Sequence, residues 1–346
     1  MAQQVIDAMD NPGLWAAFAA DGVTPSAELA LSADAQLYRF GPDRKSGRLT
    51  ATLGALDHVL RRSLPGTDLS SFEEIRLWLH SNRPANGSPE RPFYLELRLA
   101  SAAMGLEHPD NLWYRYFPVF EVRAWESIRL SLVDLPPQIR GAVNLMQLRC
   151  IEATTPFSCN LDDVLAVRLE MITDVDAALL YRLDSQATLN GSPVPAVLHH
   201  PEASVTPSMP FIRVAHYEVV PANARQMAHQ ERADYTAIGF RLRPPPAAYD
   251  LYYEVDVFAD ERAQKAHLME FVLRALAPRS TLLANGSLLP IEWVPVEAPD
   301  RIGGHRTDRA PLHFRVSTRQ EVGPPEPETV PYQSMAVLLE QKAGAG

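Results

Sequence analysis

Residues 248–295 read AYDLYYEVDVFADERAQKAHLMEFVLRALAPRSTLLANGSLLPIEWVP and decide how the second half of the chain folds. Over Tyr249–Asp260, apolar and polar positions alternate, so that Leu251, Tyr253 and Val255 share one face. A period of two is typical of a half-buried strand. We therefore predict a strand over these residues.

A helix and a hairpin complete this stretch. Glu261–Leu276 has apolar residues near helical spacing, follows Asp260 as the expected N-cap, and ends before Pro278. Asn285-Gly286 then separates two apolar runs, which is the turn chemistry of a tight hairpin. The expected core of this α+β unit comprises Leu251, Tyr253, Val255, Phe271, Val272 and Trp293.

The order "YDLYYEVDVFAD", then a helix, then "LLANGSLLPIEW" resembles the tail-terminator or cap proteins of contractile phage tails and contractile injection systems. The resemblance covers Phe211–Gln341. It implies a ring, usually a hexamer, that closes the end of a sheath-and-tube assembly, with tube and sheath proteins as partners. From the residues alone, an ordinary α+β domain with a good hairpin is the alternative.

Composition bounds the remaining possibilities. The 346 residues, 46% of them apolar, suffice for two packed domains. No run approaches the ~20 apolar residues that span a bilayer, and Met1–Asp10 lacks the order of a secretory signal, so we expect a cytoplasmic protein without a membrane partner. The net charge of −10, with 32 basic residues interspersed among 42 acidic ones, argues against a nucleic-acid partner.

The prolines mark boundaries along the chain. Pro193–Pro210 holds five prolines and little periodicity, so we expect a linker there. The predicted domains are a β-sandwich over 1–192, the linker over 193–210, and an α+β assembly domain over 211–346. Within the last, Phe211–Val220 is expected as a strand and Pro221–Tyr235 as a polar loop or arm.

The first half is expected to be all β. Short alternating segments are separated by Pro, Gly, Asn or Asp-rich turns, which favours a sandwich. The expected strands are Phe72–His80, Phe93–Ala100, Ser127–Val133, Val164–Thr173 and Ala178–Leu183. The expected core residues are Ile75, Leu77, Leu79, Leu95, Leu97, Leu99, Leu130 and Val167.

A second resemblance covers Asn11–Asp184. The phrases "GLWAAFAADGVTPSAEL", "DLSSFEEIRLWLHSN", "WESIRLSLVDLP" and "NLDDVLAVRLEMI" look like successive strands of the galactose-binding-like jelly roll, a β-sandwich shared by many carbohydrate-binding modules. The fold class that the two resemblances imply is mainly β plus α+β, with an N-terminal jelly roll followed by a tail-terminator-like domain.

Sugar recognition would need exposed aromatic rings beside polar groups. His108–Phe117 is the best candidate, because Trp113, Tyr114 and Tyr116 crowd a stretch that also carries Asp, Asn and Arg. Tyr, Trp and Arg are equally enriched at subunit interfaces, so a packed loop or an interface is the favoured interpretation of these aromatics.

We do not expect an enzyme, because the common nucleophile, zinc and phosphate-binding motifs do not occur in the sequence. His199-His200 with Glu202 is the nearest approach to a metal cluster, but adjacent histidines in a proline-rich segment favour a solvated linker. Cys150 and Cys159 fit no zinc spacing and are expected as core or loop thiols. No cofactor and no metal are predicted.

Two functions remain. The first is a structural ring protein that terminates a phage-like tail or injection system, is assembled in the cytoplasm and then becomes part of the particle, with the sandwich as peripheral decoration. The second is a carbohydrate-binding or adhesion module attached to a structural platform. The first accounts for more of the chain, since the second explains the N-terminal domain alone.

Overall fold

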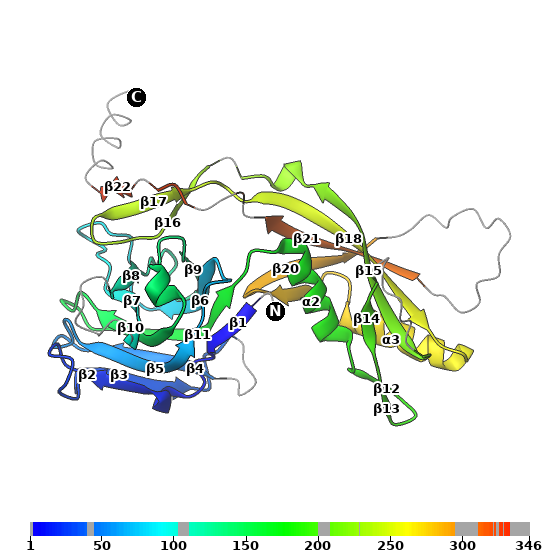
Figure 1. The fold of residues 1–346 in the computed structure, drawn as a ribbon, viewed down its shortest axis with the longest axis horizontal. Coiled ribbons are helices and arrows are strands. Elements are labelled where there is room, and N and C mark those ends of the chain that lie inside the picture. Colours follow the sequence, from blue (N-terminus) through cyan, green and yellow to red (C-terminus); the bar gives the residue numbers. More distant parts are fainter. Residues whose placement is uncertain are drawn as a thin grey trace. The chain divides into compact units, whose positions relative to one another are not determined.

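The computed structural model describes residues 3–39, 45–102, 111–199, 208–227, 229–294, 311–320, 322, 325–327 and 329–332. The chain forms two compact units (Figure 1). The sandwich unit combines Gln3–Arg168, His229–Pro244 and Gly323–Gly346, and the α+β unit combines Met1–Ala2, Leu169–Ala228 and Pro245–Val322. The fold class is the predicted one, mainly β with a few helices.

The bounds of these units differ from the predicted domains. The change of unit falls after Arg168 and not in the predicted linker over 193–210, and the chain later returns to the sandwich for His229–Pro244. The physical reason is that α2 (Met171–Leu183) carries Val175, Leu179 and Leu183 into the core of the α+β unit. The expected strand over Ala178–Leu183 was wrong, because these residues form the end of that helix.

The sandwich consists of two antiparallel sheets. The first sheet has the order β3-β4-β11-β6-β9, with β1 also paired to β11, and its strands are β1 (Gln3–Asp7), β3 (Leu29–Asp34), β4 (Ser46–Ala51), β6 (Glu74–Ser81), β9 (Trp125–Ser131) and β11 (Phe157–Val167). The second has the order β2-β5-β10-β7-β8, and its strands are β2 (Trp15–Phe18), β5 (Val59–Thr67), β7 (Leu95–Ala100), β8 (Trp113–Tyr116) and β10 (Val143–Cys150). A short helix, α1 (Pro137–Arg140), precedes β10.

Seven of the eight residues predicted for the sandwich core belong to it, whereas Val167 is buried outside this cluster and β11 contributes Val164 and Ala166 instead. Alternate residues of β6 and β7 point inward, and none of the eight predicted core side chains is more than 2% exposed: Ile75, Leu77, Leu79, Leu95, Leu97, Leu99, Leu130 and Val167. Both cysteines are buried free thiols in the same core, as predicted for structural thiols. Burial raises the pKa of Cys150 to about 12, which keeps its thiol protonated at neutral pH.

His229–Pro244 forms an arm that adds a small sheet to the sandwich. The arm holds β16 (Glu231–Ala233) and β17 (Gly239–Arg243), and β17 also pairs with β22 (Thr329–Pro331). The sequence predicted a polar loop or arm over Pro221–Tyr235, which includes the first part of this segment. The arm is ordered because Tyr235 and Phe240 join the aromatic side chains of the sandwich core, and because several of its charged residues form ion pairs with the sandwich.

Gly239 controls the pairing between β17 and β22. A Cβ atom at this position would lie 2.2 Å from the backbone oxygen of Val330, which is too close for any side chain. We expect Gly239→Ala to separate the two strands and to lower the unfolding free energy of the sandwich unit by about 1–2 kcal/mol. Amide hydrogen exchange at Phe240 and Arg241 would measure the separation, and unchanged exchange would contradict it. Gly191→Ala is the control, because its Cβ has open space, although its positive φ adds a small strain.

The α+β unit is built on one six-stranded sheet of order β14-β15-β18-β21-β20-β19. Its strands are β14 (Ala196–Leu198), β15 (Phe211–Pro221), β18 (Ala247–Phe258), β19 (Thr281–Ala284), β20 (Ser287–Trp293) and β21 (Pro311–Gln320). A short hairpin of β12 (Ala187–Leu189) and β13 (Ser192–Val194) precedes β14. The strand and hairpin predicted around residues 249–294 are therefore present, and the strand predicted over Phe211–Val220 corresponds to β15.

Both helices of this unit pack on one face of the sheet, termed the helix face. From β18, Leu251, Tyr253, Val255 and Val257 point to it and meet residues of α2 and of α3 (Arg262–Ala275). The hydroxyl of Tyr253 donates to Asp176 Oδ1 on α2 at 2.8 Å. Helix α3 lies where it was predicted, but its N-cap is Glu261 rather than Asp260, without a capping side-chain hydrogen bond.

Candidate functional site

The second face of the α+β sheet, termed the open face, carries the polar residues of β18 and their partners. On β18 these residues are Asp250, Tyr252, Glu254 and Asp256, which alternate with the apolar residues of the helix face, and Asp256 is itself buried. Arg213 of β15 bridges Glu254 and Asp256. This alternation is the one that the sequence predicted, and it gives the sheet a charged centre.

The ion pairs continue across the open face. Arg315 of β21 pairs with Glu292 of β20 and approaches Asp250 at 3.7 Å, while Arg225 donates to Asp250 at 2.7 Å. Burial acts to lower the pKa of Arg315, but the hydrogen bond to Glu292 and the charge of Asp250 outweigh it and raise the pKa. Burial raises the pKa of Asp256, and Arg213 opposes that effect. Acidic and basic groups on this face therefore compensate one another within the unit.

Exposed apolar side chains lie at the two margins of this sheet. On the β15 side, Tyr217 is 49% and Val219 is 37% exposed. The ring of Tyr217 contacts Tyr252 and His313 on the open face. In the part of the chain that the structure describes, β14 pairs with β15 only up to Val214, so the rest of this edge has no strand beside it.

The opposite margin is the hairpin of β19 and β20. Leu283 and Leu288 are paired across it and are 42% and 41% exposed. Asn285 and Gly286 both adopt positive φ, at 50° and 72°, as the predicted tight turn requires. The two margins differ in sequence and belong to opposite ends of one sheet.

The residues predicted for the core of this unit fall into three groups. The first group is fully buried, with an exposed fraction of 0% for each residue: Leu251, Tyr253, Val255 and Val272. Phe271 is half-buried and packs against the edge of the cluster. Trp293 differs from the prediction, because it is 44% exposed at the end of β20, where its ring stacks on Phe314 with 6.4 Å between ring centres.

The aromatic residues predicted for sugar binding or an interface lie on β8. Trp113 is 4% exposed, and its Nε1 donates to Asp134 at 2.9 Å, so its ring belongs to the sandwich core. Tyr114 and Tyr116 are half-buried, with ring centres 5.7 Å apart. The three rings therefore do not form one exposed platform, and residues 108–110 of the predicted segment lie outside the described residues.

Two further observations concern metals and membranes. Among the described residues, no three His, Cys, Asp or Glu side chains gather in a way that could hold a metal ion. His199 is exposed, whereas His200 and Glu202 lie outside the described residues. No described helix is both long and apolar enough to cross a bilayer.

Comparisons with known proteins give structural similarities only. No family model and no curated protein matches the chain. The sheath/tube terminator of an extracellular contractile injection system, PVC, aligns over 52% of this chain and 74% of its own, at 17% identity and a TM-score of 0.38. The family 11 carbohydrate-binding module of Clostridium thermocellum aligns over 48% and 95%, at 12% identity and 0.34. The family 30 module of a cellulosomal cellulase from that organism aligns over 49% and 99%, at 12% and 0.34.

Proposed function

We propose that this chain is a structural subunit that assembles into a closed ring and terminates the tube and sheath of a contractile tail or injection system. The observation that carries the ring is the pair of unlike apolar margins on the α+β sheet. Tyr217 and Val219 lie at one end of the sheet, and Leu283 and Leu288 lie at the other.

Unlike surfaces at opposite ends favour head-to-tail contacts between copies. Such a heterologous contact produces a ring when the rotation closes, and an open filament when it does not. The β15 margin of one copy would meet the β19–β20 margin of the next. Burial of four exposed apolar side chains at each contact would provide part of the driving force.

The role at a tail end rests on the resemblance of the sequence over residues 211–341. It implies six copies, with tube and sheath proteins as the further partners. In this proposal the subunit has no catalytic activity. It is assembled in the cytoplasm and then becomes part of the particle. The sandwich unit decorates the ring.

The ring can be tested by placing a charge on each margin separately. We expect Tyr217→Glu and Leu288→Glu each to abolish rings at micromolar protein, because a charge buried in a contact weakens it about 30-fold or more. Native mass spectrometry would then show monomers for each variant alone. Mixing the two variants should restore one intact contact and give dimers, whereas no closed ring can form.

The outcomes distinguish the possible arrangements. Val23→Glu is the matched control, because Val23 is 77% exposed in the sandwich unit and should leave the ring intact. If both variants kept the oligomer of the native chain, these margins would not be the contact. A native chain that stayed monomeric, even with its tube and sheath partners, would refute the ring itself.

The carbohydrate-binding alternative is less well supported by the predicted residues. Loss of a stacking ring matters only where the ring is exposed, and Trp113 lies within the core with its indole nitrogen bonded to Asp134. A sugar site at β8 would depend on Tyr114 and Tyr116 alone.

A further inference from the structure

Strand β9 is the outermost strand of the first sheet of the sandwich, and among the described strands β6 alone pairs with it. The N–H of Leu132 donates to the backbone oxygen of Glu73, beside β6, whereas the N–H of Ser131 donates to Asp234 Oδ1. Ser131 therefore faces away from β6. Backbone groups of every second residue in a strand point to the same side, so those of Ser127 also face away from β6. This outer edge of β9 can accept another extended segment.

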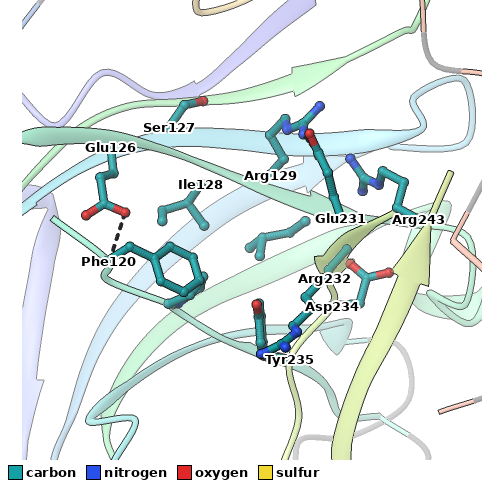
Figure 2. A pocket seen from close by; sticks show the side chains of 13 residues that line it. Phe120, Glu126, Ser127, Ile128, Arg129, Glu231, Arg232, Asp234, Tyr235 and Arg243 are labelled. Atoms are coloured by element: carbon teal, nitrogen blue, oxygen red, sulfur yellow. Dashed lines mark hydrogen bonds and ion pairs between the residues drawn. The ribbon is translucent and has the colours of Figure 1, made fainter. Parts of the chain in front are cut away.

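A pocket of about 430 Å³ lies along this edge (Figure 2). It is lined by residues 127–130 of β9, by residues of the arm strand β16, and by Pro118 and Phe120 from the loop before β9. Strands β9 and β16 belong to different sheets and are not paired with each other. The pocket is therefore bordered by the edge of a strand.

One end of the pocket is apolar and accessible. Phe120 is 61% exposed there, and Val122 of the same loop is 46% exposed. Figure 2 shows Phe120 apart from the charged group of Arg129, Glu231 and Arg243. Acidic and basic side chains are equal in number in the lining, so they favour neither a basic nor an acidic segment. An uncharged, apolar segment fits this lining best.

The last described residue of the chain lies beside the same arm. The hydroxyl of Tyr332 is within hydrogen-bond distance of the backbone oxygens of Thr236 and Gly239, at 2.7 and 3.0 Å. Thr236 directly follows Tyr235, which lines the pocket. Residues 333–346 come next and lie outside the described part of the chain. An extended chain of this length spans about 40 Å, which is enough to reach the pocket and to run along β9.

This C-terminal stretch contains an apolar run. Residues 335–339 read MAVLL, without proline, glycine or a charged side chain. A short run of this kind is typical of a segment that is buried on both faces. The charged side chains of the stretch, Glu340 and Lys342, come after the run. The chain therefore supplies, next to the pocket, a segment with the apolar character that the lining favours.

We propose that residues 335–339 dock in this pocket within the same chain and add a strand to the outer edge of β9. Backbone hydrogen bonds to this edge, at Ser127 among other positions, hold the segment, and Phe120 packs on its apolar side chains. The docked segment covers an edge that could otherwise pair with another chain. Pocket and segment both belong to the sandwich unit, so this inference does not depend on the ring proposed above.

The first test compares amide hydrogen exchange of β9 in full-length variants. Neighbouring residues of a strand point to opposite faces, so Val337→Asp/Leu338→Asp places a charge on the buried face in either orientation. We expect this variant to raise the exchange rate of the Ser127 amide about 10-fold, because the undocked segment leaves that N–H exposed to water. Gly344→Asp/Ala345→Asp is the matched control. It adds the same charge beyond the apolar run and should leave the exchange unchanged.

The second test supplies the segment as a separate peptide. The full-length Val337→Asp/Leu338→Asp chain should bind a labelled peptide of residues 333–342 with a dissociation constant on the order of 100 μM, measured by fluorescence anisotropy. For a tethered segment at an effective concentration of about 1 mM, this affinity corresponds to the 10-fold protection expected above. Adding Phe120→Ala should weaken the peptide about 5-fold or more. Leu53→Ala should not, because Leu53 is 63% exposed but does not line the pocket.

Several outcomes would overturn the proposal. They are unchanged exchange of Ser127 in Val337→Asp/Leu338→Asp, an equal increase in the control variant, and a peptide that does not bind. Protection of β9 that rises with the concentration of the native chain would assign the segment to a second copy and would also overturn docking within one chain. Phe120→Ala in the otherwise native chain should raise the exchange of Ser127 as well, which keeps the test decisive if the double variant fails to fold.

Discussion

Replacing Arg243 by methionine is expected to lower the unfolding free energy of the sandwich unit by about 3 kcal/mol. The side chain ties the arm to the sandwich through Glu74, and both partners are at most 3% exposed. Removing the guanidinium leaves the buried carboxylate of Glu74 paired with Arg76, at 3.0 Å. The ion pairs hold the pKa of Glu74 below its usual range, so the carboxylate remains charged at neutral pH.

Urea unfolding, combined with hydrogen exchange in β6 and β17, would measure this loss in the sandwich unit alone. Arg129→Met is the matched control, because the Arg129–Glu231 pair also holds the arm but is about one-quarter exposed on each side. Exposed pairs contribute about 0–1 kcal/mol. Adding Glu74→Gln to Arg243→Met should recover part of the stability. Equal effects of Arg243→Met and Arg129→Met would contradict a special role for the buried pair.

The sequence predicted best where a long element has a strong period. The alternation around Leu251 and Tyr253 identified β18 and the side that faces the helices, because burial on one face allows only one register. Asn285-Gly286 predicted its turn, because few residues other than Asn and Gly tolerate two successive positive φ angles. Strands β6 and β7 of the sandwich were predicted in the same way, from the alternation of their residues.

Other features depend on partners distant in the chain. Residues 178–183 alternate over six positions, which resembles a strand, yet Val175, Leu179 and Leu183 repeat at four-residue spacing and favour the observed helix. The packing of the arm on the sandwich could not be predicted, because Asp234 and Arg243 are ordinary polar residues until the fold places Ser131 and Glu74 beside them. The pocket depends entirely on that tertiary arrangement.

Asp163 provides the second large effect, which is a dependence of stability on pH. It lies in β11 with a positive φ of 46°, where the register with β6 shifts. Burial raises its pKa to about 7, and the nearby charges of Asp162 and Asp10 add to the rise. Because the folded state holds this proton more tightly than the unfolded chain, the contribution of Asp163 to stability is complete below about pH 4 and is lost as the pH rises through 7.

We therefore expect Asp163→Asn to remove a decrease of about 2 kcal/mol in the unfolding free energy of the sandwich unit between pH 5 and pH 8. Asparagine is uncharged, tolerates the same positive φ, and resembles the protonated side chain in shape. Urea unfolding of both proteins across this range gives the difference curve, in which the titration of other groups, such as Asp234, cancels. The variant should match the native chain near pH 4 and exceed it by a growing margin up to about pH 7, which then persists at pH 8. A difference that stayed constant with pH would show that Asp163 keeps an ordinary pKa, and the cost of burying its charge at the register shift would then have to be offset by a neighbouring cation.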